Sequence, residues 1–425
     1  MIDFNLFPFL HYTSLRDTYE KHGLRLYFNI NDNTLIDTGK VNKLLLKGYI
    51  KKDKHFLIGE KKKMNEIYSI DTMKFLYISN DSITQICSYL STQDMLKLSY
   101  SNKYLYKLLL NDKYNMKNHK FKLNYNIKSL HFMKYLSYKV INLSIEGNKM
   151  IDDSDFKYLK GIHALNMSRC NQNTITDNAF ENLKGIHTLK MSRCNQKTIT
   201  DKAFENLKGI HSLNISRCDQ KTITDNAFKN LKGIHTLDMS NCNQNTITDE
   251  TFKNLKGIHT LNISMCYQST ITDKAFENLK GIHTLIMAEC FQKTITDKTF
   301  EYLEGIHTLD MSECDQHTIT DKAFENLKGI HTLDMSGCNQ HTITDKAFEN
   351  LKGIHTLDMS GCNQHTITDN AFKYLKDIHT LNISSCDQKT ITDNAFENLK
   401  GIHTLDMLGC NQHTITDKAL KHLRI

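Results

Sequence analysis

The sequence predicts an α/β solenoid, in which a curved parallel sheet carries short helices on its convex side, preceded by a small domain of three helices. The first observation is that eleven copies of a 24-residue unit follow one another from Ile162, without insertion or deletion before the C-terminus. The second is that each copy opens with alternating apolar and polar residues and continues into an apolar pattern of helical period. Stacked supersecondary units are the common explanation of such regular self-similarity.

The first half of each copy predicts a strand with one buried face. In the copy GIHTLDMSGCNQHTITDKAFENLK, residues 330–335 alternate with a period of two. Because successive side chains of a strand point to opposite faces, we expect Leu333 and Met335 to face the core. The residues expected to face outward are Thr332, Asp334 and Ser336.

The second half of each copy predicts a polar turn and a short helix. The turn is expected around Asn339 and Gln340, and either Thr344 or Asp345 can cap the helix that follows. The residues expected to share the buried face of the helix are Ala347, Phe348 and Leu351. Gly353 then provides a left-handed stop, a conformation that glycine adopts without a steric penalty.

The spacing I-x-x-L-x-M-x-x-C, followed by I-T-D and an apolar helix, resembles the leucine-rich repeat, and the cysteine with ITD resembles its cysteine-containing subclass. The resemblance covers residues 140–425 and implies a leucine-rich-repeat solenoid of one degenerate capping repeat plus the eleven copies. In the capping repeat, Leu143 to Asp153, Asn148 takes the place of the cysteine. Twelve strands at about 4.8 Å give an arc on the order of 55 Å, which suits a protein ligand better than a metabolite.

Composition disfavours two classes of protein. Lys plus Arg exceed Asp plus Glu by only 54 to 47, spread over the chain, whereas nucleic-acid binders usually concentrate basic charge on one face. No apolar stretch reaches the roughly 18 residues of a membrane span, and residues 1–10 lack the positive region of a signal peptide. We therefore expect an intracellular protein, in the cytoplasm or nucleus, that binds neither nucleic acid nor membrane.

Two columns of the repeat contain residue types that can bind metal ions or act as nucleophiles, namely cysteine and histidine. Eleven of the twelve cysteines recur at the repeat period, from Cys170 to Cys410, and we expect buried thiols there. A zinc ion shared by His331 and Cys338 is excluded, because up to about 23 Å of extended chain separates them. The histidine column that begins at His163 is either a solvated edge row or a metal binder. A second, partial row consists of His317, His341, His365 and His413.

No motif of an active site or cofactor site is present, so we predict a non-enzymatic protein without metal or cofactor. The candidate site is instead the outward surface, where the copies diverge and the charge runs from basic to acidic. In its middle, Met265 and Tyr267 adjoin Ile286, Ala288 and Phe291, which has the anatomy of a protein-binding hot spot; drift in a recently duplicated array is the alternative. The predicted partner-binding residues are Arg169, Lys190, Arg193, Arg217, Asp238, Met265, Tyr267, Ile286, Glu289, Phe291, Asp310, Glu313, Asp334 and Asp358.

Residues 73–118 have a helical period and predict three short helices. The stretch ISNDSITQICSYLSTQDMLKLSYSNKYLYKLLL resembles the F-box, through its YL pair, its D-M-L-x-L core and its N-K helix. That resemblance implies docking on an adaptor, and a helical cap for the solenoid is the alternative. The adaptor-binding residues that it implies are Ile78, Ile83, Ile86, Leu90, Met95, Leu96 and Leu98.

An F-box before a leucine-rich array resembles the substrate receptors of Skp-cullin-F-box ubiquitin ligases, found in eukaryotes and in large DNA viruses of amoebae. The resemblance implies a non-catalytic adaptor that contacts Skp and cullin, holds a protein target on its solenoid and is a monomer outside that complex. The alternative is a leucine-rich-repeat scaffold unconnected with ubiquitin. Residues 119–139 are expected to form a linker helix, and residues 1–72 remain unassigned.

Overall fold

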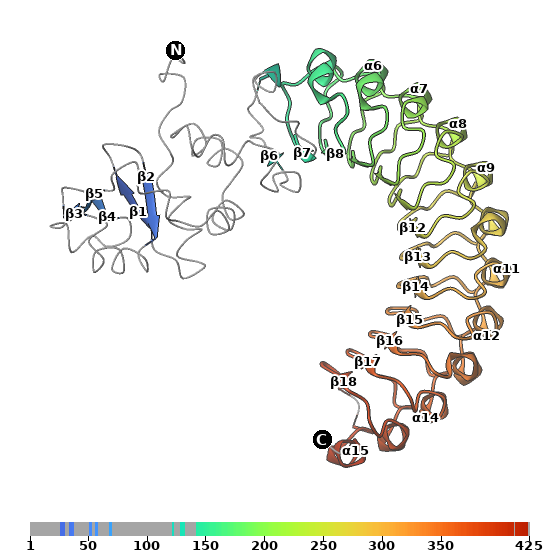
Figure 1. Cartoon of the computed structure of the whole chain (residues 1–425). Coiled ribbons are helices and arrows are strands. Elements are labelled where there is room, and N and C mark those ends of the chain that lie inside the picture. Colours follow the sequence, from blue (N-terminus) through green and yellow to red (C-terminus); the bar gives the residue numbers. More distant parts are fainter. Residues whose placement is uncertain are drawn as a thin grey trace. The chain divides into compact units, whose positions relative to one another are not determined.

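The computed structural model describes residues 26–29, 34–37, 51–52, 56–57, 68–69, 121–122, 128–131, 142–411 and 413–423. The chain divides into two compact units. The first consists of Met1–Asn124 and Phe132–Ser144, and the second of Tyr125–His131 and Ile145–Ile425. Figure 1 shows the described elements coloured along the sequence.

The described part of the first unit consists of short strands. They are β1 (Leu26–Asn29), β2 (Thr34–Asp37), β3 (Lys51–Lys52), β4 (Phe56–Leu57), β5 (Tyr68–Ser69), β6 (Phe121–Lys122) and β7 (Asn142–Ser144). Strand β1 pairs in antiparallel fashion with β2 and β4, and β3 pairs likewise with β5. The three helices expected over residues 73–118 lie outside the described residues.

The linker helix expected over residues 119–139 is wrong at Phe121 and Lys122. These two residues form strand β6, in parallel register with Leu143 and Ser144 of β7. Pairing with a distant segment decides the conformation here, because strand formation depends on packing partners more than on local preference.

In the repeat region, strands and helices alternate along the chain as the sequence predicts. The strands are β8 (Ala164–Asn166), β9 (Thr188–Lys190), β10 (Ser212–Asn214), β11 (Thr236–Asp238), β12 (Thr260–Asn262), β13 (Thr284–Ile286), β14 (Thr308–Asp310), β15 (Thr332–Asp334), β16 (Thr356–Asp358), β17 (Thr380–Asn382) and β18 (Thr404–Asp406). Strands β7 to β18 are the twelve parallel strands expected from the repeat count. Leu333 of β15 pairs with Leu357 of β16, which confirms that identical segments lie side by side.

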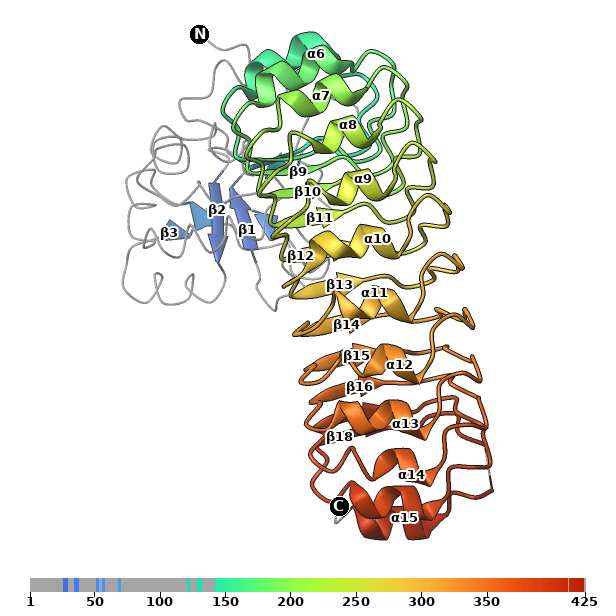
Figure 2. The same cartoon turned by 90° about the vertical axis from the view of Figure 1, so that its right-hand side faces the viewer.

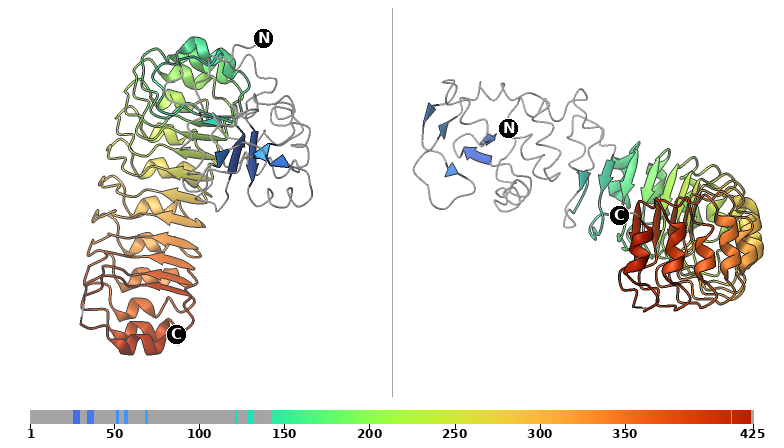
Figure 3. Two further views of the ribbon diagram at one scale, coloured as in Figure 1. Left: turned by 90° about the vertical axis from the view of Figure 1, so that its left-hand side faces the viewer. Right: turned by 90° about the horizontal axis from the view of Figure 1, so that it is seen from below.

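Each strand is followed, across a turn, by a helix of one or two turns. The α-helices are α6 (Asp177–Phe180), α7 (Asp201–Glu205), α8 (Asp225–Phe228), α9 (Asp249–Phe252), α10 (Asp273–Phe276), α11 (Asp297–Glu301), α12 (Asp321–Phe324), α13 (Asp345–Phe348), α14 (Asp369–Phe372) and α15 (Asp417–His422). The 3-10 helices are η5 (Asp153–Leu159), η6 (Glu181–Leu183), η7 (Glu277–Leu279), η8 (Glu349–Leu351) and η9 (Asp393–Asn398). Figures 2 and 3 show the strands of the repeat region on one side and the helices on the other, so that the sheet lines the concave face.

The core of the repeat region is a stack of identical layers. Leu333, Met335, Ala347 and Phe348 are fully buried, and Leu351 is nearly so, as the alternation of the sequence predicts. The same columns are buried in the neighbouring copies, and one fully buried phenylalanine stands in each layer from Phe156 to Phe396. Each repeat therefore shelters its apolar side chains mainly against the next repeat, because a 24-residue unit is too small to bury them alone.

The first repeat departs from the others as expected. Asn148, which stands in the cysteine column, is buried, and its Oδ1 accepts hydrogen bonds from the backbone N–H groups of Met150 and Ile151 at 2.8 and 2.9 Å. The backbone N–H of Ile145 donates to the carbonyl of Asn166 at 2.8 Å. The degenerate repeat thus joins the main-chain ladder of the second unit.

A carboxylate of one repeat holds the start of the helix in the next repeat. Thr344, rather than Asp345, caps α13, because its side chain accepts a hydrogen bond from the N–H of Lys346. The backbone N–H and the hydroxyl of Thr344 both donate to the carboxylate of Asp321, at 2.7 and 2.8 Å. We call this pair of bonds the Asp–Thr clamp, and it recurs in every repeat from Asp153 with Thr176 to Asp393 with Thr416.

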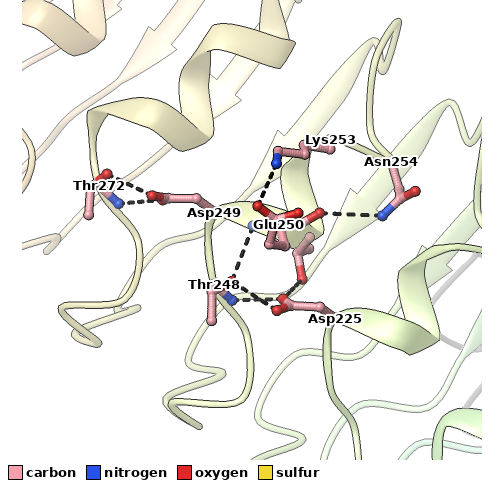
Figure 4. A network of polar contacts seen from close by, with 8 residues as sticks. Asp225, Thr248, Asp249, Glu250, Lys253, Asn254 and Thr272 are labelled. Atoms are coloured by element: carbon pink, nitrogen blue, oxygen red, sulfur yellow. Dashed lines mark hydrogen bonds and ion pairs between the residues drawn. The ribbon is translucent and has the colours of Figure 1, made fainter.

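Figure 4 shows two successive clamps, in which Asp225 holds Thr248 and Asp249 holds Thr272. The aspartate is the first residue of one helix, and the threonine is the cap of the following helix. Because a capping threonine has an extended backbone, its own N–H is free to point to the neighbouring repeat. The clamp therefore links helix to helix on the convex side, as the main-chain ladder links strand to strand on the concave side.

We predict that Asp321→Ala lowers the free energy of unfolding by about 1 to 3 kcal/mol, because the partly buried N–H of Thr344 loses its acceptor. Urea denaturation followed by circular dichroism measures the loss. Asp321→Asn retains one acceptor oxygen and should cost less. Glu325→Ala, at an exposed residue of the same copy, is the neutral control, and an equal loss in all three variants would contradict the clamp.

Candidate functional site

The predicted partner-binding residues fall into three columns of the structure. The first column is the last residue of each strand, on the side away from the core, and it contains Lys190, Asp238, Ile286, Asp310, Asp334 and Asp358. Lys190 is exposed and the other five are partly exposed. These side chains belong to the concave face, as the alternation predicts.

The acidic end of this column is a row of like charges. Asp310, Asp334 and Asp358 lie directly beside one another in the register of the sheet. Burial raises the pKa of Asp334 above its ordinary value, hydrogen bonds from Ser336 oppose the rise, and the carboxylates of Asp310 and Asp358 add to it. The row therefore favours a partner that brings positive charge.

The second column does not lie within the strands. The residue before each cysteine, expected on the face of the sheet, follows the strand and has a positive φ, between 54° and 77° in every copy. We call this column the ridge. Its members are Arg169, Arg193, Arg217, Asn241, Met265, Glu289, Glu313, Gly337, Gly361, Ser385 and Gly409.

The ridge has an energetic cost wherever it carries a side chain. A residue other than glycine in this left-handed conformation is strained by about 1 kcal/mol or more. Gly337 meets a second constraint, because a Cβ there would lie 2.9 Å from the Cγ of Glu313, which extends over it. The three glycines of the column were a signal in the sequence for this conformation.

The third column follows the cysteine and carries a ladder of side-chain acceptors. The backbone N–H of Asn195 donates to the Oδ1 of Asn171 at 3.0 Å, and eight such bonds link successive turns. Tyr267 and Phe291 stand in this column and have no oxygen in the acceptor position. Their rings stack instead, with centroids 5.8 Å apart and planes 10° apart, and their side chains are 44% and 47% exposed.

A further regular hydrogen bond is missing at Ile286. In most copies, the Asn or Asp that ends the strand accepts a bond from the N–H two residues later, as Asp310 does from Ser312 at 3.0 Å. An isoleucine cannot accept this bond. We call Met265, Tyr267, Ile286, Ala288 and Phe291 the central patch. In this patch, the side chains of Tyr267, Ile286 and Phe291 replace three hydrogen-bond acceptors of the regular repeat. Each acceptor contributes about 1 kcal/mol.

The cysteines are structural. Every cysteine from Cys170 to Cys386 is buried, and Cys410 in the last repeat is partly exposed. The thiol of Cys338 donates to the carbonyl of Met311 in the preceding repeat at 3.1 Å, and the other copies repeat this bond. Burial raises the pKa of Cys170 to about 11 and that of Cys218 to about 12. At neutral pH these thiols are protonated, which makes them poor nucleophiles.

Gln340, in the predicted polar turn, contributes its side chain to the core. Its side chain is buried, and its Nε2 donates to the carbonyl of Cys314 at 3.0 Å. Gln196, Gln220, Gln244 and Gln268 make the equivalent bond. The long polar side chain folds back into the core because the backbone carbonyl of the preceding repeat is available there as an acceptor. The sequence of a single repeat does not predict this contact.

The histidine column forms a stack. From His163 to His403, each imidazole ring lies over the next with centroids 4.4 to 4.6 Å apart, and most ring planes are within 14° of parallel. The nitrogen lone pairs of parallel rings lie in parallel planes and do not converge on a common ion. In the described ranges, no three side chains of His, Cys, Asp or Glu come together as metal ligands would. The stacked geometry therefore favours the edge-row interpretation over chelation.

Stacking affects the charge of the histidines. Partial desolvation, followed by repulsion from the histidines on both sides, lowers the pKa of His187 and of His235. The same two causes lower the pKa of His379. The folded array therefore resists protonation of these three histidines more than the unfolded chain does.

We predict that the array loses stability as the pH falls below about 6.5, the ordinary histidine pKa. With the folded pKa lowered, the unfolded chain binds more protons in this window, so the stability present above pH 6.5 is lost on acidification. The melting temperature should fall between pH 7.5 and 5.5, and the triple variant His187→Gln, His235→Gln, His379→Gln should fall less. A histidine titration by nuclear magnetic resonance with pKa values above 6.5 would disprove the mechanism.

The adaptor-binding residues implied by the F-box resemblance are not placed by the structure. Ile78, Ile83, Ile86, Leu90, Met95, Leu96 and Leu98 all lie outside the described residues. Among the helices that the structure describes, none has the length and apolar character that crossing a membrane requires.

The sequence matches the family model described as BspA type Leucine rich repeat region over residues 149–283 and 293–423, which is more than half of the chain. No sequence among the curated proteins matches it. Among solved structures, the repeat region resembles a chain of the TLR13–ssRNA13 complex, with 18% identity and a TM-score of 0.51, over 62% of this chain and 38% of that chain. This chain therefore spans about two fifths of that relative's length.

Two other solved structures have lower scores. An internalin from Listeria monocytogenes has 20% identity and a TM-score of 0.48, over 69% of this chain and 86% of that chain. A chain of the Rad7 and Elc1 complex in yeast has 17% identity and a TM-score of 0.47, over 82% of this chain and 92% of that chain. At these identities, the likeness concerns the fold alone.

Proposed function

Since this chain belongs to the family with BspA-type leucine-rich repeats, we propose that its repeat region is a non-catalytic surface that binds another protein. The central patch is the anchor, and the flanking charges of the concave face orient the partner. A patch of apolar side chains with a charged surround is the usual anatomy of a protein-binding site.

One observation carries this proposal. The copies are nearly identical, yet at the central patch they give up three hydrogen-bond acceptors and expose two stacked rings, Tyr267 and Phe291. Drift would scatter apolar replacements over the array, whereas these five adjoin one another on successive repeats and Leu408, in the last repeat, stands apart from them. Exposed aromatic side chains bury large areas on binding at little cost in conformational entropy, which favours them as anchors.

The role that the F-box resemblance implies is the finer part of the proposal. The chain is then the target-recognition subunit of a Skp-cullin-F-box ubiquitin ligase inside the cell, with residues 73–118 on the adaptor and the solenoid on the target. The helical pattern of residues 73–118 before a leucine-rich array supports it. A scaffold unconnected with ubiquitin uses the same concave surface but needs no adaptor.

We predict that Ile286→Asp reduces partner binding at least tenfold, because a carboxylate in the middle of the central patch must be desolvated on binding. The melting temperature should stay nearly unchanged, since Ile286 is partly exposed and all ten other copies carry a polar residue in this position. Affinity capture with the full chain as bait, compared by mass spectrometry between wild type and variant, measures the loss. Thr332→Asp, two strands away on the same face, is the matched control, and equal capture by wild type and Ile286→Asp would refute the anchor.

We predict that the full chain binds purified Skp adaptor and that the double variant Leu90→Asp, Met95→Asp does not, because the F-box resemblance gives both residues to the apolar adaptor contact. Pull-down and calorimetry measure the difference. Lys97→Asp, at a polar position of the same stretch, should retain binding. A wild-type chain that does not bind the adaptor would leave the scaffold as the function.

A further inference from the structure

Among the described residues, the charges of the ridge form no ion pair. Arg193 and Arg217 are exposed neighbours of like charge, and farther along the partly exposed Glu289 lies beside the exposed Glu313. In the described part of the chain, one ion pair is formed, between Lys253 and Glu250 at helix α9 on the convex side. Like charges on adjacent strands repel one another, so these rows are unfavourable in the isolated solenoid.

The six central positions of the ridge are complementary when read backwards, whereas Arg169, one repeat farther out, would meet Gly337 and has no acidic counterpart. Two arginines, Arg193 and Arg217, precede Asn241 and Met265, and two glutamates, Glu289 and Glu313, follow them at the same spacing. The midpoint lies between Asn241 and Met265. Arg217 and Glu289 are each one and a half repeats from this midpoint, and Arg193 and Glu313 are each two and a half repeats from it.

We propose that a second copy of the chain docks on the ridge in antiparallel orientation, about a two-fold axis that passes between Asn241 and Met265. In a two-fold interface, each contact occurs twice. If residue i of one copy contacts residue j of the other, then residue j of the first copy contacts residue i of the second. Arg217 of each copy then faces Glu289 of the other, and Arg193 faces Glu313. Each of these two ion pairs forms twice by symmetry, so the dimer gains four ion pairs.

A second copy explains the ridge better than an unrelated partner does. A different protein would need only one sign of charge on the ridge, or any order of the two signs. A self-complementary pattern about a point is required only when the partner is the same chain. A monomer was expected from the sequence, but the left-handed backbone that gathers these residues into one row becomes visible only in the structure.

The shape of the solenoid permits this arrangement. The ridge follows the ends of the strands, at an edge of the curved sheet. If the two-fold axis points along the radius of the curve, the two solenoids bend in the same direction. Their ridges can then run side by side from Arg193 to Glu313, a span of five repeats or about 24 Å at 4.8 Å per strand.

The centre of the proposed interface is apolar. Met265 lies half a repeat from the axis, so the two copies of Met265 are about one strand spacing, 4.8 Å, apart along the ridge. Of the central patch, only Met265 then belongs to the dimer interface. Tyr267, Ile286, Ala288 and Phe291 remain for the target, so the inference goes beyond the proposed function.

The test measures the mass of the full chain by sedimentation equilibrium at low and high salt. Wild type should dimerise, and more weakly at high salt, because the ion pairs are screened. The variant Arg193→Glu, Arg217→Glu and the variant Glu289→Arg, Glu313→Arg should each dimerise at least tenfold more weakly. All four positions already hold non-glycine residues at positive φ, so the exchanges add no new kind of backbone strain.

Two recombinations decide the assignment. An equimolar mixture of the two double variants should form a heterodimer, since the four pairing positions are then all acidic on one ridge and all basic on the other. The quadruple variant, with both ends reversed, should dimerise as wild type does. Circular dichroism melting checks that each variant is folded.

A monomeric wild type at a concentration of about 100 μM, reversed variants that still dimerise, or a mixture that fails to pair would each overturn the proposal. Ile286→Asp separates it from the proposed function, because this variant should remain a dimer. If wild type is a monomer and the arginine reversal abolishes target capture instead, the ridge is occupied by a different protein and the second copy is refuted.

Discussion

The structure of the repeat region depends on one constraint, which is that each repeat completes the hydrogen bonds of its neighbour at a constant offset along the chain. The N–H of Met335 bonds the carbonyl of Asp358 in the following repeat, and the thiol of Cys338 bonds the carbonyl of Met311 in the preceding one. A single inserted residue would shift all these donors and acceptors out of phase at once. The strict length of 24 residues is the result of this requirement.

The convex side obeys the same constraint by other means. There the strands are replaced by helices too short to stabilise themselves, since an isolated helix needs about 12 or more residues to be stable. The clamp between Asp321 and Thr344 supplies what the short helix lacks, because it orders the cap of one helix with a charge from the previous one. The main-chain ladder of the sheet, the hydrogen bonds of buried glutamines such as Gln340 and the Asp–Thr clamp together make the stability of the array a sum over neighbouring interfaces.

A scaffold of this kind separates folding from binding. The columns that bond to neighbours are nearly invariant from copy to copy, and the columns that face outward are free to differ, because a replacement there costs at most a surface hydrogen bond. The central patch and the ridge use this freedom in different ways. The patch replaces acceptors by apolar surface, and the ridge places charge on a strained backbone. A surface composed in this way can be changed one repeat at a time without loss of the fold.

The sequence by itself determined the solenoid, the register of the strands, the buried faces and the burial of the cysteines, because each of these follows from a period in the chain. It also located the central patch, since Ile286 and Phe291 each replace the Asn or Asp that nine of the ten other copies carry in the same column. Only the tertiary structure decided the positive φ of Met265 and Glu289, the burial of Gln340 and the strand at Phe121. These features depend on a backbone or carbonyl supplied by another repeat or a distant segment. The glutamine and the ridge glycines recur with the repeat, but their recurrence does not reveal which distant group they meet.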